Sequence, residues 1–184
     1  APQANHEREV KASLMDSLPF PDSSFELAQS QDVLEHLPLS SVTSVINETL
    51  RVLKPGGVFR ISTPDYNSAY LRSRCVFDSS GGTLCDMGTP GQVVWVEDRK
   101  VLEKLLPSDG NAHLWFPTKE LLGELLSLSD AKNCSDIAWY HFTNTDGTYV
   151  CSTIDHSVMP VTRTPPTDMR NNGAPISLVV DVIK

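Results

Sequence analysis

Three ionisable side chains lie close together in the sequence just after an apolar-rich segment: Asp32, Glu35 and His36. The segment 25–30 has the composition of a short strand, so its end delivers these groups to one place. An imidazole with an ordinary pKa near 6.5 can accept and return a proton at neutral pH. We therefore predict that His36, or Asp32, removes a proton from a bound substrate. The alternative is that His36 caps a short helix or packs without taking part in chemistry.

A further acidic residue, Asp16, follows residues 9–15, in which Val10, Ala12 and Leu14 alternate as they would on one face of a strand. Ligands of open α/β sheets lie beyond the carboxyl ends of the strands, so Asp16 is expected beside a ligand. In the alternative interpretation, Asp16 only caps the turn that precedes Leu18.

A histidine in the second half of the chain, His113, precedes an aromatic pair and then a helix that Thr118 can cap. We expect His113 to reach a substrate pocket. The alternative is that it anchors its loop through a hydrogen bond.

The elements that position these groups centre on residues 40–65. Apolar residues at helical spacing predict a helix that ends before Pro55 and is capped by Ser40 or Ser41. The two glycines that follow permit a positive-φ turn, and residues 58–61 have strand composition. Pro64 ends that strand because proline cannot donate a ladder hydrogen bond.

Three motifs occur in a fixed order: DSLPFPDSSFE at 16–26, DVLEHL at 32–37 and RVLKPGG at 51–57. Together they resemble the class I S-adenosylmethionine (SAM)-dependent methyltransferases, of the type-11-like subgroup. The resemblance implies an α/β fold with a Rossmann-like, mainly parallel sheet flanked by helices and an antiparallel C-terminal strand at its edge. The match begins at the third strand of that fold, so its N-terminal βαβ unit is missing or truncated.

The resemblance also implies roles for single residues. Asp16 would accept a hydrogen bond from the adenine amino group of SAM, and the backbone N–H of Ser17 would meet a ring nitrogen. Ser30 would lie where the methyl donor is bound. His36 and Asp32 would be catalytic, and His113 would bind substrate. No residue is assigned to a metal.

The rest of the chain is interpreted as one partial methyltransferase-like domain over 1–184. Residues 73–112 are expected to form a variable insertion or lid, with loop-like structure over 73–92, and 155–175 an extended loop or arm. Segments 137–142 and 148–153 are predicted to pair as a hairpin through Asp146-Gly147, and 176–183 as the final strand. Leucines from Leu121 to Leu128 predict a buried helical stripe.

Composition narrows the function classes. The net charge is −8 and basic residues are scattered, which disfavours nucleic acid as a partner. No apolar run reaches membrane-spanning length. The four cysteines form no CxxC pair, so a cysteine zinc site is not expected; Cys75 and Cys85 are either bridged or free thiols. An intracellular location, in cytoplasm or organelle, is favoured.

The family's glycine-rich turn and the acidic residue that binds the ribose have no counterpart in these 184 residues. Two hypotheses follow. The chain is either a stretch of a SAM-dependent methyltransferase that acts on a small molecule, with its cofactor motif upstream, or a non-catalytic relative that binds other proteins in a larger assembly.

Overall fold

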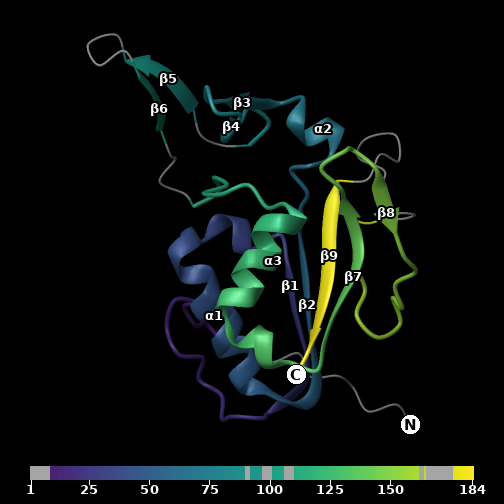
Figure 1. Ribbon diagram of the computed structural model, residues 1–184. Coiled ribbons are helices and arrows are strands. Elements are labelled where there is room, and N and C mark those ends of the chain that lie inside the picture. The colour runs from purple at the N-terminus through teal and green to yellow at the C-terminus, as the bar shows by residue number, and fades with distance from the viewer. Residues whose placement is uncertain (1–8, 90–91, 97–100, 106–109, 162–163, 165–175) are drawn as a thin grey trace.

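The computed structural model describes residues 9–89, 92–96, 101–105, 110–161, 164 and 176–184. Its main body is a five-stranded sheet with two helices packed on one face (Figure 1). The strands follow the order β1 (Phe25–Gln31), β2 (Leu53–Pro64), β9 (Ser177–Ile183), β7 (Asp136–Thr143) and β8 (Tyr149–Cys151). The helices are α1 (Leu39–Val52) and α3 (Lys119–Leu128). No helix in the described part of the chain is long and apolar enough to cross a membrane.

The sheet is mixed. β1 and β2 are parallel, whereas β9 is antiparallel to both of its neighbours, β2 and β7. β1, β2 and β7 therefore run in one direction, and β8 and β9 run in the other. This arrangement confirms the predicted α/β class with an antiparallel C-terminal strand. The position of that strand was predicted wrongly, because β9 lies inside the sheet. Its buried run of Leu178 to Val182 faces protein on both sides, as an interior strand requires.

The α1–β2 unit forms as the residue pattern predicts. Val42, Val45, Ile46 and Leu50 are buried on one stripe of α1, and β2 ends at Pro64. The capping prediction is wrong, because α1 begins at Leu39 after Pro38 with no side-chain cap. Gly56 has a φ of +76°, so the turn needs the freedom of glycine there.

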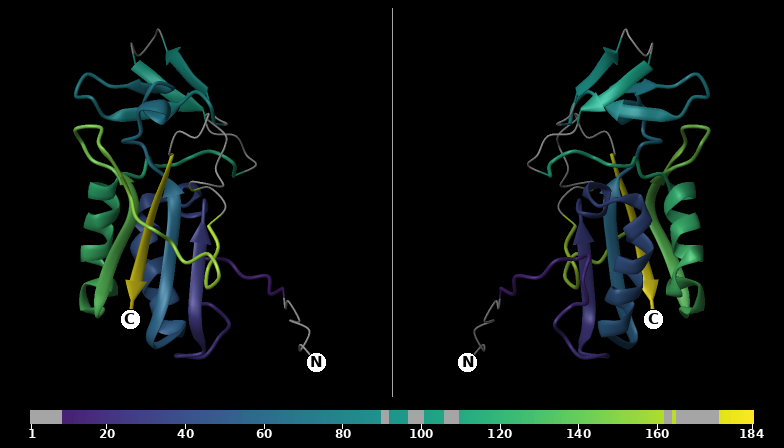
Figure 2. Two further views of the ribbon diagram at one scale, coloured as in Figure 1. Left: turned by 90° about the vertical axis from the view of Figure 1, so that its right-hand side faces the viewer. Right: turned by 90° about the vertical axis from the view of Figure 1, so that its left-hand side faces the viewer.

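The two faces of the sheet are covered differently. α1 and α3 cover one face and bury residues such as Phe59, Ile61 and Val180 in the main core. On the other face Ile154 and Val161 pack on Val179, where the segment 154–161 crosses the strands (Figure 2, left). Residues 165–175 of the predicted arm lie outside the described residues.

Two other predictions about elements need correction. Residues 9–15 form no strand. Residues 73–92, predicted to be loop-like, contain the hairpin of β3 (Cys75–Phe77) and β4 (Thr83–Asp86) and reach the start of β5. A second hairpin joins β5 (Gln92–Val96) and β6 (Val101–Leu105). Both hairpins lie beyond the carboxyl ends of β1 and β2 (Figures 1 and 2).

The remaining elements agree more closely with the sequence. Thr118 caps α3 by accepting a hydrogen bond from the Leu121 N–H, and β7 and β8 form the predicted hairpin. Leu122, Leu125 and Leu126 are buried in the stripe of α3, but Leu128 is 66 % exposed. Cys75 and Cys85 are free thiols.

Candidate active site

The candidate site lies at the carboxyl ends of β1 and β2. Asp32 follows β1 with a φ of +52°, and its N–H donates to the carbonyl of Ser62 at the end of β2 (2.9 Å). This positive φ turns the chain out of the sheet into the short 3-10 helix η1 (Leu34–His36). The strand ends thus place Asp32, Glu35 and His36 at one edge of the sheet, as the sequence predicts.

A distant segment, residues 112–115, is tied to η1 by three hydrogen bonds. The Leu114 N–H donates to the Glu35 carbonyl (2.8 Å), and the Trp115 indole donates to the Leu34 carbonyl (2.8 Å). The Nδ1 of His36 lies 3.1 Å from the Ala112 carbonyl, which can only accept, so this nitrogen carries the proton. These bonds bring His113 next to His36, with ring centroids 4.9 Å apart and ring planes at 77°.

His113 belongs to a chain of polar contacts through Tyr66. Its Nδ1 lies 2.6 Å from the Tyr66 hydroxyl, which donates to the Asp86 carboxylate (2.9 Å). Arg74 forms an ion pair with the same carboxylate. Burial, reinforced by the Asp86 charge, raises the pKa of Tyr66, so the phenol stays protonated. Because its one proton goes to Asp86, the phenol oxygen accepts from Nδ1–H of His113.

Glu35 completes this group. It is fully buried at 0 % exposure, between the buried Leu34 and the half-buried His36. One ligand-type atom from each of Glu35, His36 and His113 lies within 4.8 Å of the other two. The structure therefore unites two predicted residues, His36 and His113, with a carboxylate to which the sequence analysis gave no role.

Ser30, predicted to lie beside the cofactor, lines a pocket of about 320 Å³ between β1 and α1. Its hydroxyl oxygen is buried and has no hydrogen-bond partner among the described residues, which is costly for a polar group. The rest of the lining is mainly apolar, and it includes Phe20, Phe25 and Val45.

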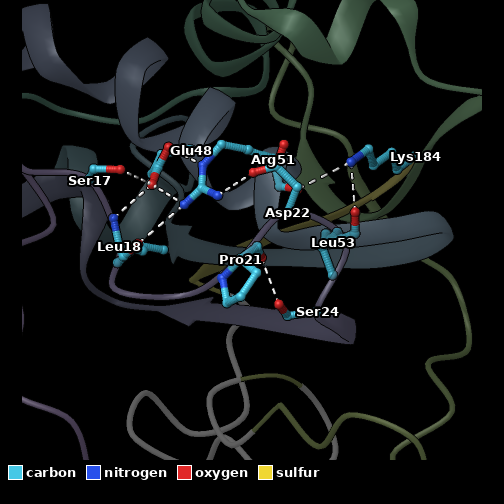
Figure 3. A network of polar contacts seen from close by, with 9 residues as sticks. All are labelled: Ser17, Leu18, Pro21, Asp22, Ser24, Glu48, Arg51, Leu53 and Lys184. Carbon is cyan, nitrogen blue, oxygen red and sulfur yellow. Dashed lines mark hydrogen bonds and ion pairs between the residues drawn. The ribbon is translucent and has the colours of Figure 1, made fainter.

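Asp16 and Ser17 lie elsewhere. The Ser17 hydroxyl donates to Glu48 (2.9 Å), and the Leu18 N–H donates to the same carboxylate (2.7 Å), as Figure 3 shows. Glu48 belongs to the last turns of α1, at the end of the helix away from η1. Asp16 is exposed in a turn, because the strand expected to carry it to the sheet edge does not form. Leu14 and Leu18 still reach the pocket wall.

Besides Glu35, sequence reasoning missed three residues of the site: Tyr66, Asp86 and Trp115. Tyr66 lies 20 residues from Asp86 and 47 from His113, so no local spacing connects them. Asp86 also falls in the segment predicted to be a loop. The aromatic pair after His113 was noticed, but its bond to Leu34 spans 81 residues.

Comparisons with known proteins agree with the predicted class. Residues 1–61 match the family described as "Methyltransferase domain". Over 57 residues the chain is 37 % identical to a Mycolicibacterium smegmatis protein named "Probable S-adenosylmethionine-dependent methyltransferase". The overlap is 31 % of this chain and 21 % of that protein. This chain thus covers about a fifth of that relative. The match over residues 1–61 confirms the resemblance to the SAM-dependent methyltransferases.

Solved structures also align over most of the chain. A SAM-dependent methyltransferase from Thermotoga maritima has a TM-score of 0.49 and 15 % identity over 95 % of this chain and 63 % of that one. A Methanosarcina mazei SAM-dependent methyltransferase has a TM-score of 0.46 and 17 % identity, and the alignment covers 100 % of this chain and 72 % of that one. The 1,6-didemethyltoxoflavin N1-methyltransferase of Burkholderia thailandensis, solved with S-adenosylhomocysteine, has a TM-score of 0.44 and 15 % identity. That alignment covers 95 % of this chain and 49 % of the other.

Proposed function

We propose that this chain is part of a SAM-dependent methyltransferase that transfers a methyl group to a small-molecule acceptor. The observation that carries the proposal is the position of Asp32 and His36. Both follow β1 within the segment that matches the methyltransferase family, at the carboxyl edge of the sheet where α/β proteins bind ligands.

The described residues fit one side of a SAM molecule. The buried Ser30 hydroxyl has a donor and lone pairs to offer, and the apolar pocket beside it can accept a flat ring. A glycine-rich turn and a ribose-binding carboxylate, the family's other cofactor contacts, have no counterpart in the sequence. The fit is therefore partial, and SAM, when bound, supplies the methyl group that is transferred.

The residues of the chain would act on the acceptor. His36 carries its proton on Nδ1, so its Nε2 has the lone pair that can take a proton from an acceptor hydroxyl or amine. Asp32 is the second candidate base. His113 would orient the acceptor, because Tyr66 and Asp86 hold its ring in one tautomer. The two hairpins beyond the strand ends would cover the acceptor and exclude water.

Calorimetric titration with SAM and S-adenosylhomocysteine tests the cofactor part of the proposal. We expect binding that Ser30→Ala weakens. Asp16→Asn is the matched variant, because it tests the role that the family resemblance implies for a residue now found in an exposed turn. Methyl transfer is then followed as S-adenosylhomocysteine release with a panel of phenols, amines and heterocycles. No cofactor binding at millimolar concentration would overturn the proposal for this chain.

A second candidate function is that of a non-catalytic subunit that binds another protein. The partial cofactor site favours it, as do the exposed side chains of Phe25 and Leu27 on β1. This alternative predicts a chain that binds neither SAM nor S-adenosylhomocysteine, and it predicts that lysine at position 27 weakens complex formation. Cofactor binding with product release would reject it.

A further inference from the structure

We propose that Glu35, His36 and His113 bind one divalent cation of the zinc class. Two imidazoles and one carboxylate are a known protein ligand set for zinc, with further positions left for water or an acceptor. The ligand-type atoms lie within 4.8 Å of one another. Ligands at 2.0–2.2 Å from a tetrahedral zinc would lie about 3.3 Å apart, so modest side-chain movements close the site.

The hydrogen bonds on Nδ1 prepare both histidines for this role. The Ala112 carbonyl holds the proton on Nδ1 of His36, and the Tyr66 hydroxyl accepts from Nδ1 of His113. In each ring the lone pair is therefore on Nε2, the form in which imidazole binds a metal. Metal-binding histidines usually donate their other N–H to a carbonyl or a carboxylate-linked group, which sets the tautomer and ring orientation.

Glu35 supplies the negative charge. Its side chain is 0 % exposed, and a buried carboxylate is stabilised when a cation compensates its charge. Two hydrogen bonds also hold together the segments that carry the ligands. The Leu114 N–H donates to the Glu35 carbonyl, and the Trp115 indole N–H donates to the Leu34 carbonyl. The fold therefore already holds the two ligand-bearing segments side by side before a cation binds.

This inference does not depend on the proposed methyl transfer, since cation binding is measured without SAM or acceptor. It differs from the sequence expectation, which considered cysteine ligands and assigned no metal. With a cation bound, His36 is a ligand and not a general base.

The test is to titrate the metal-stripped chain with Zn²⁺, with binding measured by calorimetry, and with Co²⁺, with binding measured by visible absorption. We expect one equivalent to bind, with Co²⁺ bands of nitrogen and oxygen coordination. Loss of an outer-shell partner costs about 10–100-fold in affinity. Glu35→Gln and His113→Ala, which remove ligands, should therefore weaken binding by more than about tenfold. His156→Ala, which removes a half-buried imidazole of the 154–161 segment, should bind as the parent does.

Two further measurements make the result decisive. Thermal melts without metal show whether each variant is folded, and Glu35→Gln is the isosteric change least able to disturb packing. Alkylation of the exposed Cys151 and the half-buried Cys75 and Cys134 in the folded chain separates the site from binding by these thiols. Stoichiometric binding that survives Glu35→Gln and His113→Ala, or that disappears on alkylation, would overturn the proposal. Absence of binding by the folded parent chain would overturn it as well.

Discussion

At the residue scale, the Tyr66 hydroxyl contacts Nδ1 of His113 and so determines which ring nitrogen carries the proton. Tyr66→Phe removes the acceptor for Nδ1–H, so we expect the imidazole to become a mixture of tautomers. The variant loses two hydrogen bonds, the one that Tyr66 donates to Asp86 and the one that it accepts from His113. Arg74 and the Gly88 N–H still bind the Asp86 carboxylate, so we expect the unfolding free energy to fall by about 2 kcal/mol, which is roughly 1 kcal/mol for each lost bond. Long-range ¹H–¹⁵N spectra and urea unfolding measure the two effects. A single, unchanged tautomer in the variant would contradict the assignment.

A second residue-scale prediction concerns acid stability. Glu48 accepts hydrogen bonds from Arg51, Ser17 and Leu18, and these, with Arg51 first, lower its pKa to about 2 (Figure 3). A folded-state pKa below the ordinary 4.5 means that the stabilisation is complete above about pH 4.5 and is lost as the pH falls toward 2. We therefore expect Glu48→Gln to be less stable than the parent at pH 7, with the difference shrinking below pH 4.5.

Urea unfolding at pH 7, 4.5 and 3 measures this difference. Glu26→Gln is the control, because Glu26 forms only an exposed pair with Lys54, and exposed pairs contribute little. Parallel pH profiles for the parent and Glu48→Gln would show that the network does not hold the N-terminal segment against α1.

At the scale of elements, β2 and β9 are joined by a charged pair inside the sheet. Arg60 lies opposite Asp181 in the register and makes two hydrogen bonds to its carboxylate, of 2.8 and 2.7 Å. A third bond reaches the Met159 carbonyl, so the pair also holds the 154–161 segment on the sheet. Both side chains are about 5 % exposed. The carboxylate raises the pKa of Arg60, which therefore stays charged.

Asp181→Ala leaves this guanidinium without its carboxylate, and we expect a loss of about 3–5 kcal/mol of unfolding free energy. Replacement of both residues, Arg60→Met with Asp181→Leu, should cost much less, since it removes both buried charges. Denaturant unfolding of the single and double variants measures the coupling. Equal losses in the two variants would mean that the strands, and not the ion pair, carry the stability.

The elements that the sequence predicts correctly are those whose signal is local. The stripe of α1, the end of β2 at Pro64 and the Thr118 cap depend on neighbours within a few residues. The position of β9 between β2 and β7 depends on partners in β2 that are more than a hundred residues away in the sequence. The residue pattern within β9 therefore cannot predict that position. The site shows the same difference between local and long-range signals. The position of His36 can be predicted from the end of the strand just before it, whereas the contact between Tyr66 and Asp86 forms when the β3–β4 hairpin folds back.

At the scale of the whole molecule, the described sheet has two unlike edges. β8 at one edge is short, and β1 at the other is seven residues long with no further strand beside it. Phe25 and Leu27 are 38 % and 42 % exposed on β1, and both also line the apolar pocket. A long edge strand with apolar side chains offers unpaired backbone groups to another chain. Within the described residues, the sheet is therefore covered on both faces and uncovered at the β1 edge.

This margin predicts how the chain behaves in solution. We expect the chain to self-associate as its concentration rises, and we expect Leu27→Lys to reduce association, because a charge on an edge strand must lose its water when another strand pairs with it. Val158→Lys is the control, since Val158 is 52 % exposed on the segment across the sheet and not on the edge. Sedimentation velocity over a hundredfold range of protein concentration compares the association of the parent chain, Leu27→Lys and Val158→Lys. A parent chain that stays monomeric throughout would show that β1 is not a pairing edge. Equal effects of the two lysines would show the same, because only Leu27 of the two positions lies on β1.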